Sequence, residues 1–124
     1  MKTIASEDAP KALGPYSQAV SHQGIVYCSG QIGLTADGAW AGDTVAEQTT
    51  QSLQNLDAVL KAAGSNKSQV IRATIFLASM DDFGVVNEIY ADFFGDHRPA
   101  RACVEAQRLP KDALVEISVI AATV

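Results

Sequence analysis

The stretch RACVEAQRLPKDALVEISVIAA, residues 101–122, decides the fold class because it holds two alternating segments around a turn. Every second residue of the segment 113–122 is apolar: Val115, Ile117, Val119 and Ala121. Such a face is typical of a strand that packs against helices. The segment 101–107 alternates in the same way, with a small or apolar set made of Ala102, Val104 and Ala106. Two strands flanking the turn-like RLPKD are therefore predicted.

Two amphipathic helices are predicted upstream of these strands. The first carries apolar or small residues at helical spacing: Val45, Thr49, Leu53, Leu56, Val59, Leu60 and Ala63. Thr44 and Glu47 fit a capping box at its start, and Gly64 is a natural stop. The second helix is predicted from about Asp82 to Phe94, and Gly95 ends it. Its apolar residues recur at intervals of three and four: Phe83, Val86, Tyr90 and Phe93.

Three further extended runs complete the predicted sheet. Residues 17–22 and 25–29, joined by Gln23-Gly24, predict a hairpin, and residues 70–78 predict a largely buried strand. Strands that alternate with helices predict one α+β domain over residues 1–124, a mixed sheet with both helices packed on one face. The other face, which carries polar anchors together with Ile and Leu, is predicted to be a subunit interface.

The alternation in the last two strands also predicts a site on that uncovered face. If Ala102 and Val104 face the helices, Arg101 and Cys103 share the open side with Glu116. If the two strands are neighbours, Cys103 lies opposite Glu116 and Arg101 lies one diagonal step away, at about 7–8 Å. If another strand intervenes, the two backbones are still only about 10 Å apart. Either arrangement predicts room for a small molecule bridged by a water.

Composition excludes several classes of function. The net charge is −5 and the basic residues are scattered, so nucleic acid is an unfavourable main partner. His22 and His97 lie in no metal-ligand spacing, which argues against a metal site. The start, MKTIASEDAPKA, has no apolar core for a signal peptide and no stretch suits a membrane span. We therefore expect a cytoplasmic protein whose two cysteines are reduced.

Four segments resemble the RidA/YjgF family: GPYSQAV at 14–20, SGQIG at 29–33, NEIYADFF at 87–94 and RPARACVEAQRLPKDALVEISVIA at 98–121. The resemblance implies a fold like that of chorismate mutase, assembled as a homotrimer with ligand sites between subunits. It also implies a deaminase that hydrolyses reactive 2-imino and enamino acids, such as 2-aminoacrylate and 2-iminobutanoate, to 2-keto acids and ammonia. No cofactor and no metal are expected.

The resemblance also implies roles for individual residues. Arg101 would hold the substrate carboxylate, for which its planar fork of donors is suited. Glu116 would orient the attacking water, and a nearby Arg101 should keep it ionised. Cys103 would contribute backbone contacts without thiolate chemistry. The rest of the pocket, partly from a neighbouring chain, would be lined by Tyr16, Ser29, Gly30 and Asn87.

The residues leave alternatives open. Arg101 is equally suited to pairing with Glu105, with Glu116 or with the end of a helix. Cys103 is more often a small buried hydrophobe than a nucleophile. The protein as a whole could bind 2-keto acids, or a protein partner, without turnover. An RNA-directed activity is also attributed to some relatives, and the acidic chain argues against it.

Overall fold

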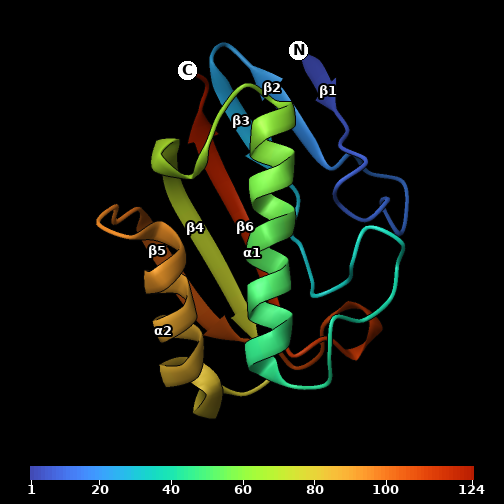
Figure 1. Ribbon diagram of the computed structural model, residues 1–124, viewed down its shortest axis with the longest axis vertical. Helices are drawn as coiled ribbons and strands as arrows, with labels where there is room; N and C mark the ends of the chain where they lie inside the picture. Colours follow the sequence, from blue (N-terminus) through green and yellow to red (C-terminus); the bar gives the residue numbers. More distant parts are fainter.

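The computed structural model describes residues 1–124 as a six-stranded sheet with two helices on one face (Figure 1). The elements are β1 Lys2–Ile4, β2 Ala19–His22, β3 Ile25–Cys28, α1 Val45–Ala62, β4 Val70–Leu77, α2 Phe83–Phe94, β5 Ala100–Glu105 and β6 Val115–Ala122. The strand order is β1-β2-β3-β6-β4-β5, and only the β4–β5 pair is parallel. The predicted α+β class, the mixed sheet and the placement of both helices are confirmed.

Local sequence signals account for several element boundaries. Gln23 and Gly24 have φ of 51° and 81°, the left-handed conformations that a tight two-residue hairpin turn requires. Thr44 and Glu47 form the predicted capping box, and Gly64 follows α1 with φ of 76°. The strand β1 was not predicted. It has only three residues and is held by pairing with β2.

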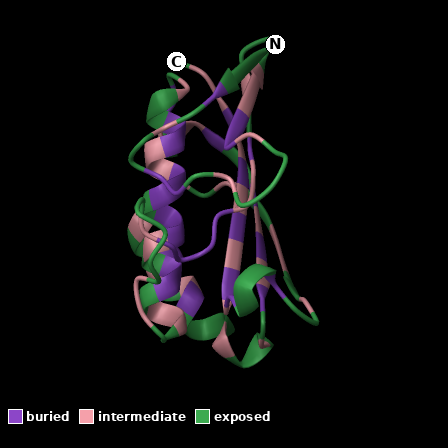
Figure 2. Cartoon of the chain, turned by 90° about the vertical axis from the view of Figure 1, so that its right-hand side faces the viewer, coloured by how far each residue is buried: buried purple, intermediate pink, exposed green.

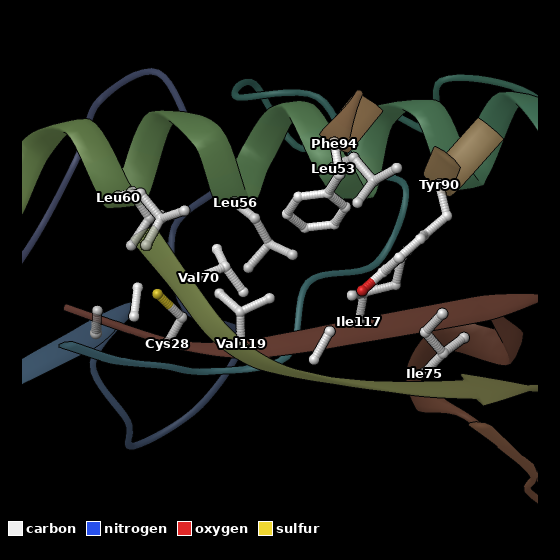
Figure 3. Close-up of a cluster of buried hydrophobic side chains, with 14 of the residues drawn as sticks. Cys28, Leu53, Leu56, Leu60, Val70, Ile75, Tyr90, Phe94, Ile117 and Val119 are labelled. Atoms are coloured by element: carbon white, nitrogen blue, oxygen red, sulfur yellow. The ribbon is translucent and has the colours of Figure 1, made fainter. Parts of the chain in front are cut away.

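The main core lies between the helix layer and the sheet, where Figure 2 shows the buried residues gathered. Figure 3 shows its centre, with side chains from both helices against β4 and β6: Leu53, Leu56, Leu60, Tyr90, Phe94, Val70, Ile75, Ile117 and Val119. Full burial of each leucine or isoleucine contributes about 1.5–3 kcal/mol. Neither helix combines the length and the apolar sequence that crossing a bilayer requires.

Polar side chains on the buried face of α1 fix the segment that follows β3. The Asn55 amide donates to the carbonyls of Ile32 and Leu34, at 3.2 and 2.8 Å. The Gln48 side chain accepts from the backbone N–H of Leu114 at 2.9 Å. A Cβ added at Gly33 would lie 2.6 Å from the Cα of Gln48, so the loop and the helix touch backbone to backbone. This loop is therefore clamped against α1.

The sheet register overturns the prediction for the face of β5. β4 lies between β5 and β6, with Ile75 paired to Cys103 on one side and to Ile117 on the other. Ile75 and Ile117 are fully buried under the helices, so Cys103 and Arg101 lie on the helix-covered side. The apolar set, Ala102 and Val104, instead lies on the open side. The alternation of β5 was predicted correctly, but its apolar set was assigned to the wrong face, because the open face also carries apolar side chains such as Phe76 and Ile120.

We expect Gly33→Ala to lower the free energy of unfolding by about 1–3 kcal/mol, because the new methyl group would overlap the α1 backbone. The matched control is Gly84→Ala in α2, where an added Cβ meets no atom within 4 Å. This control should raise stability by up to about 1 kcal/mol, since alanine is the better helix former. Urea denaturation followed by circular dichroism measures both values. Equal stability of the two variants would contradict the close approach at Gly33.

Candidate functional site

Arg101 lies on the helix side of the edge strand β5 and has no anionic partner. Its guanidinium carbon is 5.0 Å from the centre of the Tyr90 ring and 5.6 Å from that of Phe83. The two salt bridges of the chain, Lys61–Asp57 and Arg108–Asp112, involve other residues. The donor groups of Arg101 are therefore free to bind a ligand.

The pairings that would make Arg101 a structural residue are not formed within the chain. Glu105 instead accepts a hydrogen bond from the backbone N–H of Met80 at 2.9 Å. Glu116 lies on the opposite face of the sheet. At the C-terminal end of α2 it is Arg98, not Arg101, that donates hydrogen bonds to the backbone carbonyls of Gly95 and His97. None of the three alternatives weighed from the sequence is realised within the chain.

A hollow of about 320 Å³ adjoins Arg101. It is lined by Asn87, Tyr90, Ala91, Arg98, Pro99 and Arg101. Two arginines and no acid line it, so its charge suits an anion. The predicted residue Asn87 thus lies at the same hollow as Arg101.

Cys103 follows Arg101 on the same side of β5 and packs against the main core. Burial raises the pKa of its thiol, and the nearby Arg101 offsets only part of this effect. The group is therefore a neutral thiol at neutral pH.

Glu116 lies on the open face, against the segment that follows β3. A Cβ added at Gly30 would be 2.8 Å from the Glu116 carboxyl carbon, so the carboxyl group rests on bare backbone. Half-burial there raises the pKa of Glu116 above its usual value. Proximity to Arg101 was expected to favour the ionised form. Within one chain this expectation is wrong, because Arg101 is on the other face.

Tyr16 and Ser29 lie beside Gly30, on the Glu116 side of the molecule. Tyr16 and Gly30 line one small hollow between the N-terminal loop and the segment after β3. The Tyr16 hydroxyl accepts a hydrogen bond from the Leu13 N–H at 3.0 Å. The Ser29 hydroxyl donates to the Ser17 carbonyl at 2.6 Å. Loop contacts thus hold Tyr16 and Ser29 beside Gly30, the residue on which the Glu116 carboxyl group rests.

The predicted residues therefore form two groups that do not meet within one chain. We call Arg101, Asn87 and Cys103 the arginine group, and Glu116, Gly30, Ser29 and Tyr16 the glutamate group. The strand β4 separates them, and Arg101 and Glu116 point to opposite sides of the sheet. The sequence left open whether β5 and β6 are neighbours or are separated by another strand. The structure shows them separated by β4, but the prediction that Arg101 and Glu116 share a face of the sheet is wrong.

Sequence reasoning missed the aromatic partners of Arg101. Phe83, Asn87 and Tyr90 follow one another at intervals of four and three, so they share a face of α2. This spacing was a usable signal, but the sequence analysis interpreted both aromatic residues only as part of the apolar stripe of the helix. The Tyr90 hydroxyl is buried without a hydrogen-bond partner, and burial raises its pKa. No cluster of three or more metal-ligating side chains occurs in the chain.

Comparison with known proteins identifies several similar chains. The family model described as Endoribonuclease L-PSP matches residues 6–123. A 2-iminobutanoate/2-iminopropanoate deaminase from Salmonella typhimurium is 43% identical, over 97% of this chain and 96% of its own. The solved structure of the YjgF gene product from E. coli is 42% identical with a TM-score of 0.94, covering 98% of each chain. That of E. coli TdcF with bound serine is 38% identical with a TM-score of 0.95, covering all of each chain.

We expect Glu116→Gln to stabilise the fold more at about pH 7 than at about pH 4. The pKa of the native carboxyl lies above its usual 4.5. As the pH rises from 4.5 through the raised native pKa, the native state binds more protons than the unfolded chain, so the glutamate protein loses stability. Glutamine has no proton to lose in this window. Urea denaturation at both pH values measures the gain, and an equal gain at both would refute burial as the cause.

Proposed function

The chain belongs to the Endoribonuclease L-PSP family, the RidA/YjgF family that its sequence resembles, and from this premise we propose that it is an imine deaminase. Its substrates are 2-imino and enamino acids such as 2-aminoacrylate and 2-iminobutanoate, and its products are 2-keto acids and ammonia. The observation that carries the proposal is the free guanidinium of Arg101 beside an acid-free hollow. Curated relatives at 43–46% identity are named as deaminases of this kind.

Arg101 binds the carboxylate that all these substrates share. A guanidinium presents two parallel N–H donors to a carboxylate, which fixes both the position and the plane of the ligand. The structure of TdcF contains serine, an amino acid with the same carboxylate, which supports a carboxylate ligand for this fold. Asn87 and the backbone around Cys103 lie beside Arg101 and complete this half of the site.

Glu116 positions the water that attacks the imine carbon. The water adds to the imine carbon while one of its protons passes through the carboxylate to the nitrogen, which gives a carbinolamine. The carboxylate then takes the hydroxyl proton and passes it to the nitrogen as the C=O bond forms and the C–N bond breaks. One imine and one water thus yield one keto acid and one ammonia. A carboxyl group with a raised pKa suits this exchange, since it accepts a proton from water more readily than an ordinary glutamate does. Because imines hydrolyse readily, positioning and electrostatics supply most of the acceleration.

The complete site forms between copies of the chain, in a homotrimer. The arginine group and the glutamate group lie on opposite sides of one sheet, so a second copy must bring them together. The open face offers the surface for this assembly: Val104 is 47% exposed and Tyr27 is 49% exposed, beside Phe76 and Ile120. An apolar face of this kind is a typical oligomer interface. We place the reaction in the cytoplasm, where Cys28 and Cys103 stay reduced.

A ligand-binding module without turnover is the second candidate, because the free Arg101 serves binding as well as catalysis. Glu116 distinguishes the two: binding of a keto acid does not require it, whereas hydrolysis does. An RNA-directed activity, which the family description names, has less support. The net charge of −5 works against phosphate binding.

We expect the protein to accelerate keto-acid release from imines that a serine or threonine dehydratase generates in a coupled assay. Arg101→Ala should abolish the acceleration, since the carboxylate clamp is lost, and Glu116→Ala should reduce it by about 10²–10⁴-fold. Light scattering checks that each variant still assembles. Arg108→Ala, which removes an arginine held in an exposed ion pair with Asp112, is the matched control. Activity of Glu116→Ala at the wild-type level would refute its role.

Mixing the two inactive variants tests whether the site lies between copies. If Arg101→Ala and Glu116→Ala chains are unfolded and refolded together, about one interface in four receives an intact arginine and an intact glutamate from different chains. We therefore expect about a quarter of wild-type activity to return. Refolding each variant alone is the control. A mixture that stays inactive although mass spectrometry shows mixed oligomers would place the whole site within one chain.

A further inference from the structure

Arg101 is held by aromatic rings where an arginine in a folded protein is usually held by an acid. Phe83, the first residue of α2, and Tyr90, two turns later, both lie under its guanidinium. No carboxylate and no carbonyl in the chain accepts a hydrogen bond from it. The rings therefore supply its only specific contacts within the chain.

Tyr90 provides a fixed support. It is 6% exposed, and its ring lies 4.6 Å from that of Phe94 in the core. Phe94 in turn contacts the ring of His97, whose Nε2 lies 2.7 Å from the carbonyl of Val70 at the start of β4. A continuous row of packed rings thus joins Arg101 to the sheet. This row limits the positions that the Tyr90 face, and with it the guanidinium, can take.

The position of Phe83 is fixed by the short turn Met80–Asp82, which directly precedes α2. The Ser79 hydroxyl caps this turn by accepting from the Asp81 N–H at 3.2 Å, and the Met80 N–H binds Glu105. The second contact has a further effect, because it engages the acid that shares the Arg101 side of β5. The same turn therefore fixes a ring near Arg101 and keeps a carboxylate away from it.

We propose that Phe83 and Tyr90 are positioning residues for the carboxylate clamp: their rings orient the Arg101 guanidinium while leaving its N–H donors free. This inference rests on the proposed function, in which Arg101 binds the substrate carboxylate. A guanidinium attracted to ring faces keeps its hydrogen-bonding capacity for a ligand. An acid in the same place would occupy these donors and compete with the substrate. The rings thus reduce the side-chain entropy that Arg101 loses when it binds the substrate. They occupy none of its N–H donors.

The test compares a series at Phe83, which is 36% exposed and so can be replaced with little effect on the core. Phe83→Leu keeps an apolar side chain but removes the ring, whereas Phe83→Tyr keeps an aromatic ring at this position. The matched control is Val85→Ala on the same helix, a side chain of comparable exposure, 44%, that is not one of the rings beside Arg101. KM and kcat are measured for each variant, together with the Kd for 2-oxobutanoate by calorimetry.

We expect Phe83→Leu to raise KM, and the Kd for 2-oxobutanoate, by about three- to tenfold with kcat nearly retained, which is the loss expected for one partly exposed cation–π contact. Phe83→Tyr should keep both constants near the wild-type values, and Val85→Ala should leave them unchanged. Tyr90→Leu should act in the same direction as Phe83→Leu, provided that denaturation shows it folded.

Three outcomes would overturn the inference. If Phe83→Leu binds and turns over like the wild type, the ring does not position Arg101, although the deaminase would stand. If Phe83→Tyr fails to keep the constants near the wild-type values, the role of Phe83 is not that of an aromatic face. If the wild type neither binds 2-oxobutanoate nor hydrolyses imines, the carboxylate clamp and the proposed function fall together. Ring-dependent binding without turnover would instead support the positioning role and refute the deaminase.

Discussion

The double pairing of β4 is the constraint on which the rest of the structure depends. β4 is bonded to β6 in antiparallel fashion on one side and to β5 in parallel fashion on the other. Partners across a sheet point to the same side, so the register that buries Ile75 against Ile117 also places Arg101 beneath α2. The same register turns Glu116 to the open face. One strand thereby fixes the positions of both groups of the site.

Features that depend on a few neighbouring residues could be predicted from the sequence. The capping box at Thr44, the Gln23-Gly24 turn and the helix end at Gly64 need no knowledge of distant contacts. The three residues of β1 carry no such signal, because only pairing with β2 makes them a strand. The register shift in β4 between Val70 and Arg72 also has no signal in the local sequence. It resets the alternation by one residue, and so decides which side chains of β4 face the core.

The candidate site was predictable in composition but not in arrangement. Family resemblance identified Arg101, Glu116 and their neighbours, but it carries no information on the faces they occupy. Alternation in β5 predicted that Ala102 and Val104 would face the helices, on the assumption that apolar residues are covered by their own chain. That assumption fails for a sheet whose second face also carries exposed apolar side chains, such as Val104 and Tyr27. The aromatic partners of Arg101 were missed for a related reason: an aromatic residue at helical spacing is usually a core residue, and Tyr90 is both.

The separation of Arg101 and Glu116 has a chemical consequence. Two opposite charges about 4 Å apart attract by about 4 kcal/mol near a protein surface, so an arginine and a glutamate in contact within one chain would largely satisfy each other. A substrate carboxylate would then have to displace the glutamate. In this structure Arg101 instead rests on Phe83 and Tyr90, while Glu116 rests on Gly30 with a raised pKa. In the proposed assembly the substrate enters between them, and its carboxylate neutralises Arg101. The arginine then no longer lowers the pKa of Glu116, which keeps the glutamate able to take a proton from water and return it to the leaving nitrogen.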